Sequence, residues 1–209
     1  MAIETNERSR DVYQLKVLLL GTKPPIWRRL LVPAEMTLQH LHSVLQAAMG
    51  WEDEHLHEFR IGTRRFGKAD PSGGFGGSHI ASERNVPLFA VLGRTGAKAV
   101  YTYDFGDSWE HGILVEKVLT HDPQPALPVC LDGKGACPPE DCGGIPGFCD
   151  LLEAIQEPAH EEHDTLIEWL GDFDPEAFSV NEVNRRLARL QRRWNTSKKR
   201  PHRATSSDN

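Results

Sequence analysis

The chain has 209 residues, of which 39% are hydrophobic and 26% are charged. This composition is ordinary for a soluble globular protein with one domain, or with one domain and a small helical extension. No apolar run approaches the roughly 20 residues that cross a bilayer, and the polar, mixed-charge N-terminus is no signal peptide. We therefore expect a cytoplasmic protein with no membrane contact.

The net charge of -6 conceals an asymmetry along the chain. Between Asp104 and Glu182 there are 19 acidic residues and two basic ones, whereas all nine charged residues from Arg185 to Arg203 are Lys or Arg. Phosphate binding needs a basic face on the folded part of a protein. The acidic body therefore argues against general nucleic-acid binding.

The N-terminal part predicts a hairpin followed by a helix. Residues 1–10 are expected to form a loose leader, and residues 12–21 and 26–33 predict two strands joined by the turn "TKPP". Thr37 is a candidate N-cap, and Gly50 ends the helix. One face of this helix is apolar, with Leu38, Leu41, Val44, Leu45 and Ala48.

The middle of the chain predicts further strands and two long loops. Residues 55–67 favour a third strand and a turn, and residues 86–93 a short helix or turn. Two strands are expected on either side of Gly106-Asp107. The Gly/Ser-rich stretch 67–80 predicts a flexible loop, and 121–147 a long Cys-rich loop.

The C-terminal part predicts three helices, over 148–156, 163–171 and 179–194. Ser179 and Glu182 have the spacing of a capping box, and the buried stripe of the last helix comprises Val180, Val183, Leu187 and Leu190. Residues 195–209 have the composition of a disordered basic tail. The element order predicts one α+β domain over 11–194: a mixed or mostly antiparallel sheet of about five strands, one helix across it and a C-terminal helical layer.

The stretch "YTYDFGDSWEH" from Tyr101 to His111 suggests a polar hairpin. If Gly106-Asp107 is a two-residue turn, Thr102, Asp104, Trp109 and His111 share one face of the strands. His111 is then a candidate metal ligand or general base, with Asp104 orienting its ring. In the alternative interpretation Asp104 and Asp107 serve the turn, and His111 is a surface cross-strand residue.

Two further features suggest metal ligands. His55 and His57 form an H-x-H pair, and in a strand both rings point to the same face. The four cysteines, Cys130, Cys137, Cys142 and Cys149, have the spacing C-x6-C-x4-C-x6-C, which matches neither a zinc ribbon nor a C-x-x-C redox pair.

We therefore expect a mixed site, in which two or three thiolates from Cys130, Cys137 and Cys142 join one histidine. The histidine would be His55, His57 or His111, and sulfur together with imidazole favours Zn²⁺. In the alternative, the cysteines are small buried apolar residues under a long loop.

Other chemistry is less clearly indicated. In a metal-dependent hydrolase, protons would be handled by Asp104, Asp107, Glu110 or Glu140. The last helix interleaves leucines with arginines that could contact nucleic acid, namely Arg185, Arg186, Arg189, Arg192 and Arg193. In the alternative, it is an amphipathic closing helix whose arginines face water or the acidic body.

Four motifs in order carry a family resemblance: "LKVLLLGTKPPIWRRLLVP", "TLQHLHSVLQAAMGWEDEHLHEF", "YTYDFGDSWEHGILVEKVL" and "CLDGKGACPPEDCGGIPGF". Over Tyr13 to Leu187 the chain resembles the Ri-plasmid open-reading-frame-three family, whose members are also labelled insertion-element passenger or TnpR-like proteins. The resemblance implies a single α+β domain of its own type, associated with mobile elements, and no activity. The recurring positions match here as His55, His57, Asp104, Asp107, Trp109, His111, Cys130, Cys137, Pro138, Pro139, Glu140, Asp141, Gly143 and Gly144.

These features favour a binding or accessory module that engages a protein partner and holds zinc. A metal-dependent hydrolase that uses the His/Asp/Cys corner is the first alternative. A nucleic-acid accessory protein that acts through the arginine-rich helix is the second.

Overall fold

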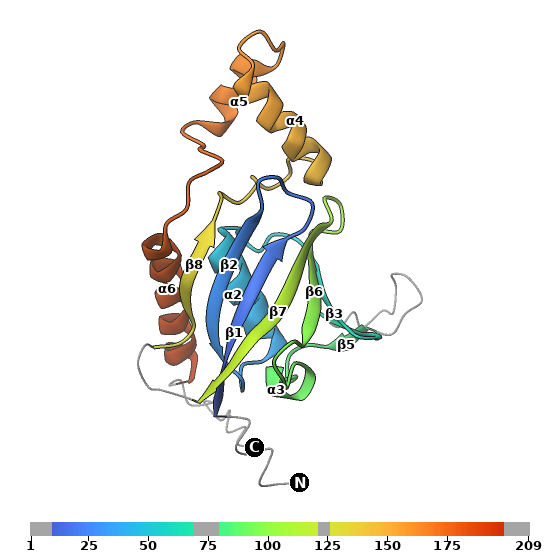
Figure 1. Cartoon of the computed structure of the whole chain (residues 1–209), viewed down its shortest axis with the longest axis vertical. Coiled ribbons are helices and arrows are strands. Elements are labelled where there is room, and N and C mark those ends of the chain that lie inside the picture. Colours follow the sequence, from blue (N-terminus) through green and yellow to red (C-terminus); the bar gives the residue numbers. More distant parts are fainter. Residues whose placement is uncertain (1–9, 69–79, 121–125, 199–209) are drawn as a thin grey trace, which may run out of the picture.

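A computed structural model describes residues 10–68, 80–120 and 126–198 of the chain (Figure 1). The elements follow in the order β1 (Asp11–Leu19), β2 (Ile26–Pro33), α2 (Leu38–Met49), β3 (His57–Ile61), β4 (Arg64–Gly67), β5 (Ile80–Ser82), α3 (Leu88–Val91), β6 (Lys98–Tyr103), β7 (Trp109–Thr120), β8 (Val129–Lys134), α4 (Gly144–Gln156), α5 (His163–Leu170) and α6 (Val180–Lys198). Within these residues, no helix is both long and apolar enough to cross a bilayer.

The strands form one eight-stranded sheet in the order β5-β4-β3-β6-β7-β1-β2-β8. Every neighbouring pair is antiparallel except β4 and β5, which are parallel. The predicted α+β class with a mostly antiparallel sheet is confirmed, but the expected five strands were too few. The strands not anticipated are β4, β5 and β8, which are short or contain Gly and charged residues that disfavour strands in isolation.

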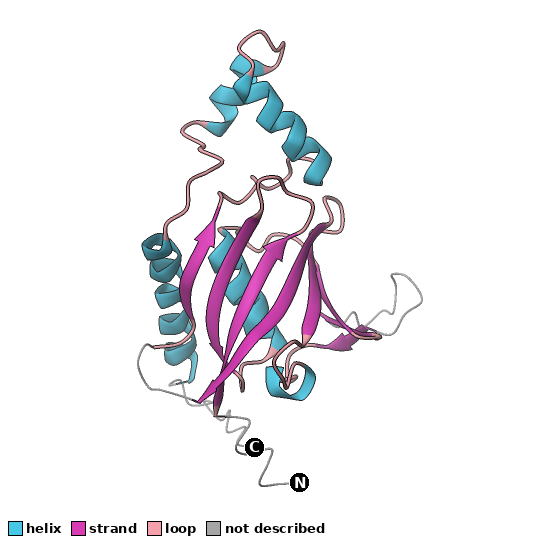
Figure 2. Ribbon diagram, viewed as in Figure 1, coloured by secondary structure: helices cyan, strands magenta, loops and turns pink. Residues whose placement is uncertain are grey.

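One face of the sheet packs against α2. Inward side chains alternate along the strands, as in β1 with Tyr13, Leu15, Val17 and Leu19, all nearly inaccessible to solvent. The predicted apolar stripe of α2 is buried throughout. Figure 2 shows α2 behind the sheet, and none of the described helices covers the opposite face.

Both predicted ends of α2 are confirmed. The Thr37 side chain accepts a hydrogen bond from the backbone N–H of His40 at 3.3 Å. Gly50 ends the helix with φ of 108°, a left-handed conformation that glycine adopts without a Cβ penalty.

The C-terminal helices have two different environments. The hairpin of α4 and α5 projects beyond one end of the sheet, and α6 returns along β8 (Figure 1). The Asn184 side chain on α6 accepts a hydrogen bond from the N–H of Cys130 at 2.7 Å and donates one to its carbonyl at 2.9 Å. Asn184 thereby satisfies backbone groups that an edge strand would leave unpaired. Only α6 therefore forms the expected helical layer on the sheet.

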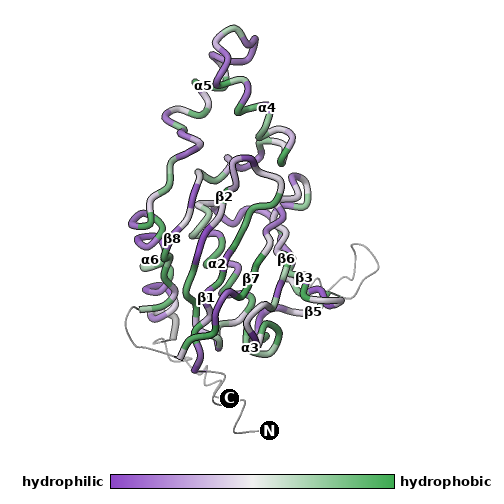
Figure 3. The backbone as a smooth tube through the Cα atoms, viewed as in Figure 1, coloured by the Kyte–Doolittle hydropathy of each residue, from purple (hydrophilic) through white to green (hydrophobic). Residues whose placement is uncertain are grey.

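The hydropathy of the chain differs between the sheet and the projecting hairpin of α4 and α5 (Figure 3). Apolar segments run along the strands of the body, whereas the connection between α4 and α5 is hydrophilic.

Within α6, Val183 and Leu187 of the predicted stripe are buried against the core, and Val180 and Leu190 are partly exposed. The Ser179 hydroxyl accepts the N–H of Glu182 at 3.3 Å, as its predicted capping role requires.

The predicted loops and ends lie partly outside the described residues. This holds for residues 1–9 of the leader, 69–79 of the Gly/Ser-rich loop, 121–125 of the Cys-rich loop and 199–209 of the tail. The rest of the Cys-rich segment is not one long loop, because residues 129–134 form β8 and α4 begins at Gly144.

Candidate functional site

The hairpin of β6 and β7 has a longer turn than expected. Tyr103 pairs with Trp109, and Tyr101 pairs with His111, so residues 104–108 form a five-residue connection. The predicted two-residue turn is therefore wrong, and Thr102 lies on the opposite face from His111. The physical cause is local: Asp104 and Ser108 both have φ of 55°, and the N–H of Ser108 bonds the Asp104 carbonyl at 2.6 Å.

Three loops converge at this end of the sheet, and we call them the polar corner: residues 51–56, 104–108 and 138–144. The Trp51 indole donates to the Pro138 carbonyl at 3.0 Å, joining the first loop to the third. The Glu140 carboxylate accepts the Tyr103 hydroxyl at 2.7 Å, and the Asp107 carboxylate accepts the N–H of Gly143 at 3.2 Å. These contacts hold the Pro- and Gly-containing loop against the end of the sheet.

The backbone of the polar corner is strained. Among the described residues, the only non-glycine residues with positive φ are Asp53, Asp104, Ser108 and Asp141, and all four belong to these loops. Such conformations persist where the surrounding structure over-determines them, and they cluster at binding and catalytic sites. The polar corner therefore has the backbone features of a functional site.

His55 lies between two carboxylates of the corner. Its Nδ1 is 3.8 Å from Asp104 and its Nε2 is 3.4 Å from Asp141. The Nε2 atom is buried, and no hydrogen-bond partner for it is found within the described residues. Asp104, a predicted catalytic candidate, also accepts the N–H of Gly106 at 2.9 Å. It thus serves the turn and faces His55 rather than His111.

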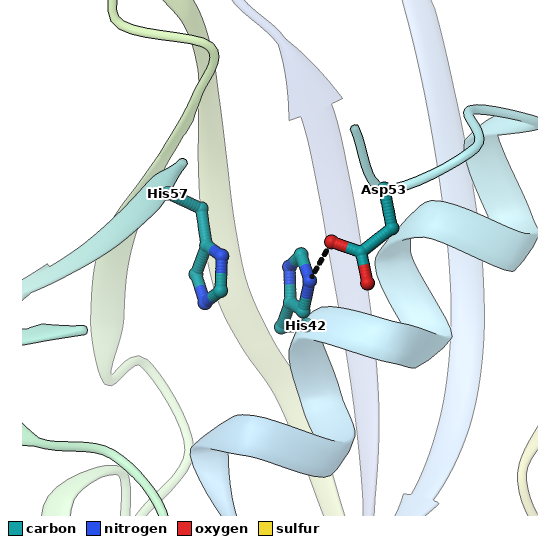
Figure 4. A group of neighbouring side chains, drawn as sticks. All are labelled: His42, Asp53 and His57. Atoms are coloured by element: carbon teal, nitrogen blue, oxygen red, sulfur yellow. Dashed lines mark hydrogen bonds and ion pairs between the residues drawn. The ribbon is translucent and has the colours of Figure 1, made fainter. Parts of the chain in front are cut away.

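A second group lies between α2 and β3 (Figure 4). His42 Nε2 is 2.7 Å from the Asp53 carboxylate, and the His42 and His57 rings stack with centroids 3.5 Å apart and planes 7° apart. Figure 4 shows the two imidazoles side by side, with Asp53 beyond His42. Burial lowers the pKa of His42, and the neighbouring His57 lowers it further, whereas Asp53 opposes the shift. The His42 ring is therefore kept neutral near physiological pH.

Further side chains orient these rings. The Tyr101 hydroxyl lies 2.8 Å from His42 Nδ1 and accepts a hydrogen bond from Gln46 at 2.9 Å. The buried Glu83 carboxylate lies 2.8 Å from His57 Nε2. Burial raises the pKa of Tyr101, which keeps its hydroxyl protonated. No sequence pattern predicted a role for Glu83, because it is 26 residues from its partner along the chain.

The predicted H-x-H pair does not act as a unit. His57 is the first residue of β3, but His55 precedes the strand, so the two do not share a strand face. Each belongs to a different group of possible ligands, His57 with His42 and Asp53, and His55 with Asp104 and Asp141.

His111 is a core residue, contrary to the interpretation as a surface cross-strand residue. It is fully buried, and its Nδ1 lies 3.1 Å from the Trp109 carbonyl and 3.3 Å from the Tyr101 carbonyl. Burial lowers its pKa to about 4. Its Nε2 is buried, with no hydrogen-bond partner in the described part of the chain.

The cysteines join neither group of possible ligands, and all four are free thiols. Cys130 is buried in the core, as the alternative interpretation expects, and Cys149 is exposed. Burial raises the pKa of Cys130 and Cys137, and raises that of Cys142 to about 12. A raised pKa disfavours the thiolate that binds metal. The described geometry thus assembles no mixed Cys/His ligand set, and zinc binding through these thiols stays a prediction.

The remaining catalytic candidates do not all lie in the polar corner. Glu110 lies on the face opposite His111 and pairs with Arg60 at 3.4 Å, away from the corner. Asp107 and Glu140 are held in the corner by the contacts with Gly143 and Tyr103 described above. Only Asp107 and Glu140 therefore join Asp104 in the corner.

The arginines of α6 differ in their surroundings. Arg185, Arg189, Arg192 and Arg193 are exposed, and Arg185 pairs with Glu182 at 2.5 Å. Arg186 is half-buried and also pairs with Glu182, at 3.5 Å. The exposed arginines fit both an amphipathic closing helix and a nucleic-acid contact.

A cavity of about 900 Å³ adjoins the polar corner. It lies where the C-terminal ends of α2 and α5, the N-terminal end of α6 and the loop before α4 meet. Its aromatic walls include Trp51, Trp169, Phe173 and Phe178, and two of the corner's carboxylates, Glu52 and Glu140, line it. Trp169 is 54% exposed although it is a large apolar residue. Sequence reasoning identified none of these aromatic residues, because they are distant in the chain.

Comparisons with known proteins agree with this architecture. An uncharacterised protein of Sinorhizobium fredii, y4hQ, is 41% identical over 191 residues, which are 88% of this chain and 94% of that protein. The crystal structure of MM3350, a protein of unknown function from Methanosarcina mazei Go1, matches with a TM-score of 0.75 and 38% identity, over 83% of this chain and 97% of that one. The model of the plasmid pRiA4b ORF-3-like family matches residues 11–182. The chain therefore belongs to the plasmid pRiA4b ORF-3-like protein family, as its motifs suggested.

Proposed function

We propose that this protein is a binding module that docks a basic, partly apolar polypeptide segment in the cavity beside the polar corner. The observation that carries the proposal is the combination of aromatic walls and uncompensated carboxylates in one cavity of about 900 Å³.

The aromatic lining supplies the binding energy in this proposal. Trp51 comes from the loop after α2, Trp169 from the end of α5, and Phe173 and Phe178 from the connection to α6. Tryptophan and other aromatic side chains in pockets dominate the energy of protein interfaces. An exposed Trp169 costs solvation energy in the free protein, and a partner's apolar side chain would remove that cost.

The charges of the cavity select the partner. The two arginines in the lining are already engaged: Arg28 donates to the Ala48 carbonyl at 2.9 Å, and Arg186 pairs with Glu182. Glu52 and Glu140 have no cationic partner in the described part of the chain, so they can accept a lysine or arginine of the partner.

The surrounding charge extends this preference beyond the cavity. From residue 135 to residue 184 the sequence contains 13 Asp and Glu and no Lys or Arg. The hairpin of α4 and α5 and its flanking loops therefore carry one sign of charge, which raises the association rate of a basic segment and opposes an acidic one. Phosphate groups are disfavoured here for the same reason.

The test is binding of fluorescein-labelled twelve-residue peptides, measured by anisotropy at two salt concentrations. The peptides share one central tryptophan and differ in net charge. We expect the basic peptide to bind and the acidic one not to bind. In a Glu52→Gln/Glu140→Gln variant, affinity should fall about tenfold, equivalent to about 1.4 kcal/mol. Glutamine keeps an oxygen acceptor for the Tyr103 hydroxyl, so the corner retains its contact.

The matched control is Asp150→Asn/Glu157→Gln, which removes the same charge outside the cavity lining. If both double variants weakened peptide binding equally, the loss of affinity would come from the overall charge of the protein rather than from Glu52 and Glu140. That result would contradict the proposal. Trp169→Ala should also weaken binding of the basic peptide, and unchanged affinity would contradict the role of the aromatic wall.

A second candidate function is nucleic-acid binding through α6. The observation that favours it is the exposure of Arg185, Arg189, Arg192 and Arg193 on one helix, away from the acidic cavity.

A further inference from the structure

We propose that His42, Asp53 and His57 form a binding site for a divalent transition-metal ion of the zinc class. The site is distinct from the Cys/His set expected from the sequence, and it does not depend on peptide binding in the cavity. One ligand atom from each of the three residues lies within 4.8 Å of the other two. The residues come from α2, the loop after it and the first residue of β3.

The donor set determines the class of ion. Two imidazole nitrogens and one carboxylate oxygen suit Zn²⁺, Co²⁺ and related ions, whereas Mg²⁺ and Ca²⁺ prefer oxygen donors throughout. The imidazole side chains are buried, with 6% and 7% of their surface exposed for His42 and His57. The carboxylate of Asp53 is 56% exposed. An ion held here would therefore keep one side open to water.

The hydrogen bonds around the rings prepare them for coordination. The Glu83 carboxylate accepts the Nε2–H of His57, which leaves the lone pair on Nδ1 available. No hydrogen bond to that Nδ1 is found within the described residues, although the side chain is more than nine-tenths buried. The Asp53 carboxylate accepts the Nε2–H of His42 at 2.7 Å, so Nδ1 of His42 accepts from the Tyr101 hydroxyl. Metal binding through Nε2 therefore requires the proton to move to Nδ1, where the Tyr101 hydroxyl can accept it instead.

The three ligand atoms must move closer together to coordinate an ion. Zinc–ligand bonds of 2.0–2.1 Å place the ligand atoms of a tetrahedral site about 3.3 Å apart, so the group must close by at most about 1.5 Å. Two parallel rings cannot direct their lone pairs at one ion, so the stack between His42 and His57 must open. Rotation of the His57 ring about its contact with Glu83, together with the exposed Asp53 side chain, can supply this movement.

The test uses the full chain, treated with a chelator and dialysed free of metal. Zinc binding is followed by isothermal titration calorimetry, and Co²⁺ binding by its visible absorption. We expect one ion per chain. In His57→Gln the stoichiometric site should be lost, and in Asp53→Asn affinity should fall at least tenfold. Asp53 is largely exposed, so the second variant tests the site even where His57→Gln fails to fold.

The matched control is His55→Gln, which removes a histidine only two residues from each of Asp53 and His57 but belongs to the other group. It should bind zinc like the parent. A long-range ¹H–¹⁵N spectrum of the imidazoles should show the ion on Nδ1 of His57, with Nε2 still protonated. Absence of stoichiometric binding in the parent, loss of binding in His55→Gln, or unchanged binding in Asp53→Asn would each overturn the assignment.

Discussion

Replacing Gly144 by alanine tests how tightly the start of α4 is held against the turn between β6 and β7. Gly144 has φ of 67°, and a Cβ built there would lie far inside contact distance of the Asp107 carbonyl oxygen. The left-handed conformation costs an alanine about 1–2 kcal/mol, and forcing an extra methyl into a packed site costs about 1–3 kcal/mol. Together these costs amount to about 2–5 kcal/mol, and we expect Gly144→Ala to destabilise the fold by about 3 kcal/mol, within that range.

Gly62 provides the control, because it has φ of 59° in the turn between β3 and β4 with no atom near the position of a Cβ. Gly62→Ala should cost only the conformational term, about 1.5 kcal/mol. For a domain of this size 1 kcal/mol shifts Tm by about 2–4 °C, so we expect losses of about 6–12 °C and about 3–6 °C. Urea denaturation gives the free energies, and amide hydrogen exchange of residues 103–109 should accelerate in Gly144→Ala alone. Equal destabilisation by both variants would refute the contact with Asp107.

Three more predictions concern other parts of the molecule. His111 is buried and neutral, and its folded pKa of about 4 lies below the ordinary value of 6.5. The unfolded chain then binds the extra proton, so stability should fall as pH drops from about 6.5 to 4, by at most about 1.4 kcal/mol per pH unit. We expect the free energy of unfolding, measured by urea denaturation, to change less with pH across that range in His111→Gln than in the parent. The same pH dependence in both proteins would contradict the lowered pKa of His111. Arg28→Ala should cost about 2–4 kcal/mol, because its guanidinium bonds three backbone carbonyls in a buried setting, whereas Arg29→Ala should cost below about 1 kcal/mol. If both variants lost a similar amount of Tm, the buried position of Arg28 would not make it more important for stability than Arg29. If α6 contacts nucleic acid, Arg189→Gln/Arg192→Gln should lower the slope of log affinity against log salt by about 2 for duplex DNA in a filter-binding assay. An unchanged slope would remove these two side chains from that surface.

Elements with a strong local signal were predictable. The helix α2 has its cap at Thr37, its apolar stripe and its ending Gly50 within 14 consecutive residues. The alternation along β1 and β2 is equally local, and so is the cap of α6 at Ser179. These features depend on side-chain periodicity and on hydrogen bonds between residues three or four apart, so they can be predicted without knowledge of the fold.

The edge strands were not predictable on the same basis. Strand β8 contains Asp132 and Gly133 and has little strand preference of its own. It forms because β2 offers an unpaired edge and α6 covers it through Asn184. Tertiary pairing therefore overrides the local preference there.

The sequence showed which residue types could form a site, but not which of these residues contact one another. Histidines and carboxylates were evident around residues 53–57 and 104–111. The predicted register of β6 and β7 was wrong by one residue, however, so Thr102 was placed opposite His111 where the structure has Tyr101. The grouping of His57 with His42 and Glu83, and of His55 with Asp104 and Asp141, depends on loops that meet across the end of the sheet. Sequence spacing carries no information on such contacts, because their geometry is set by backbone conformations that only the packed structure stabilises.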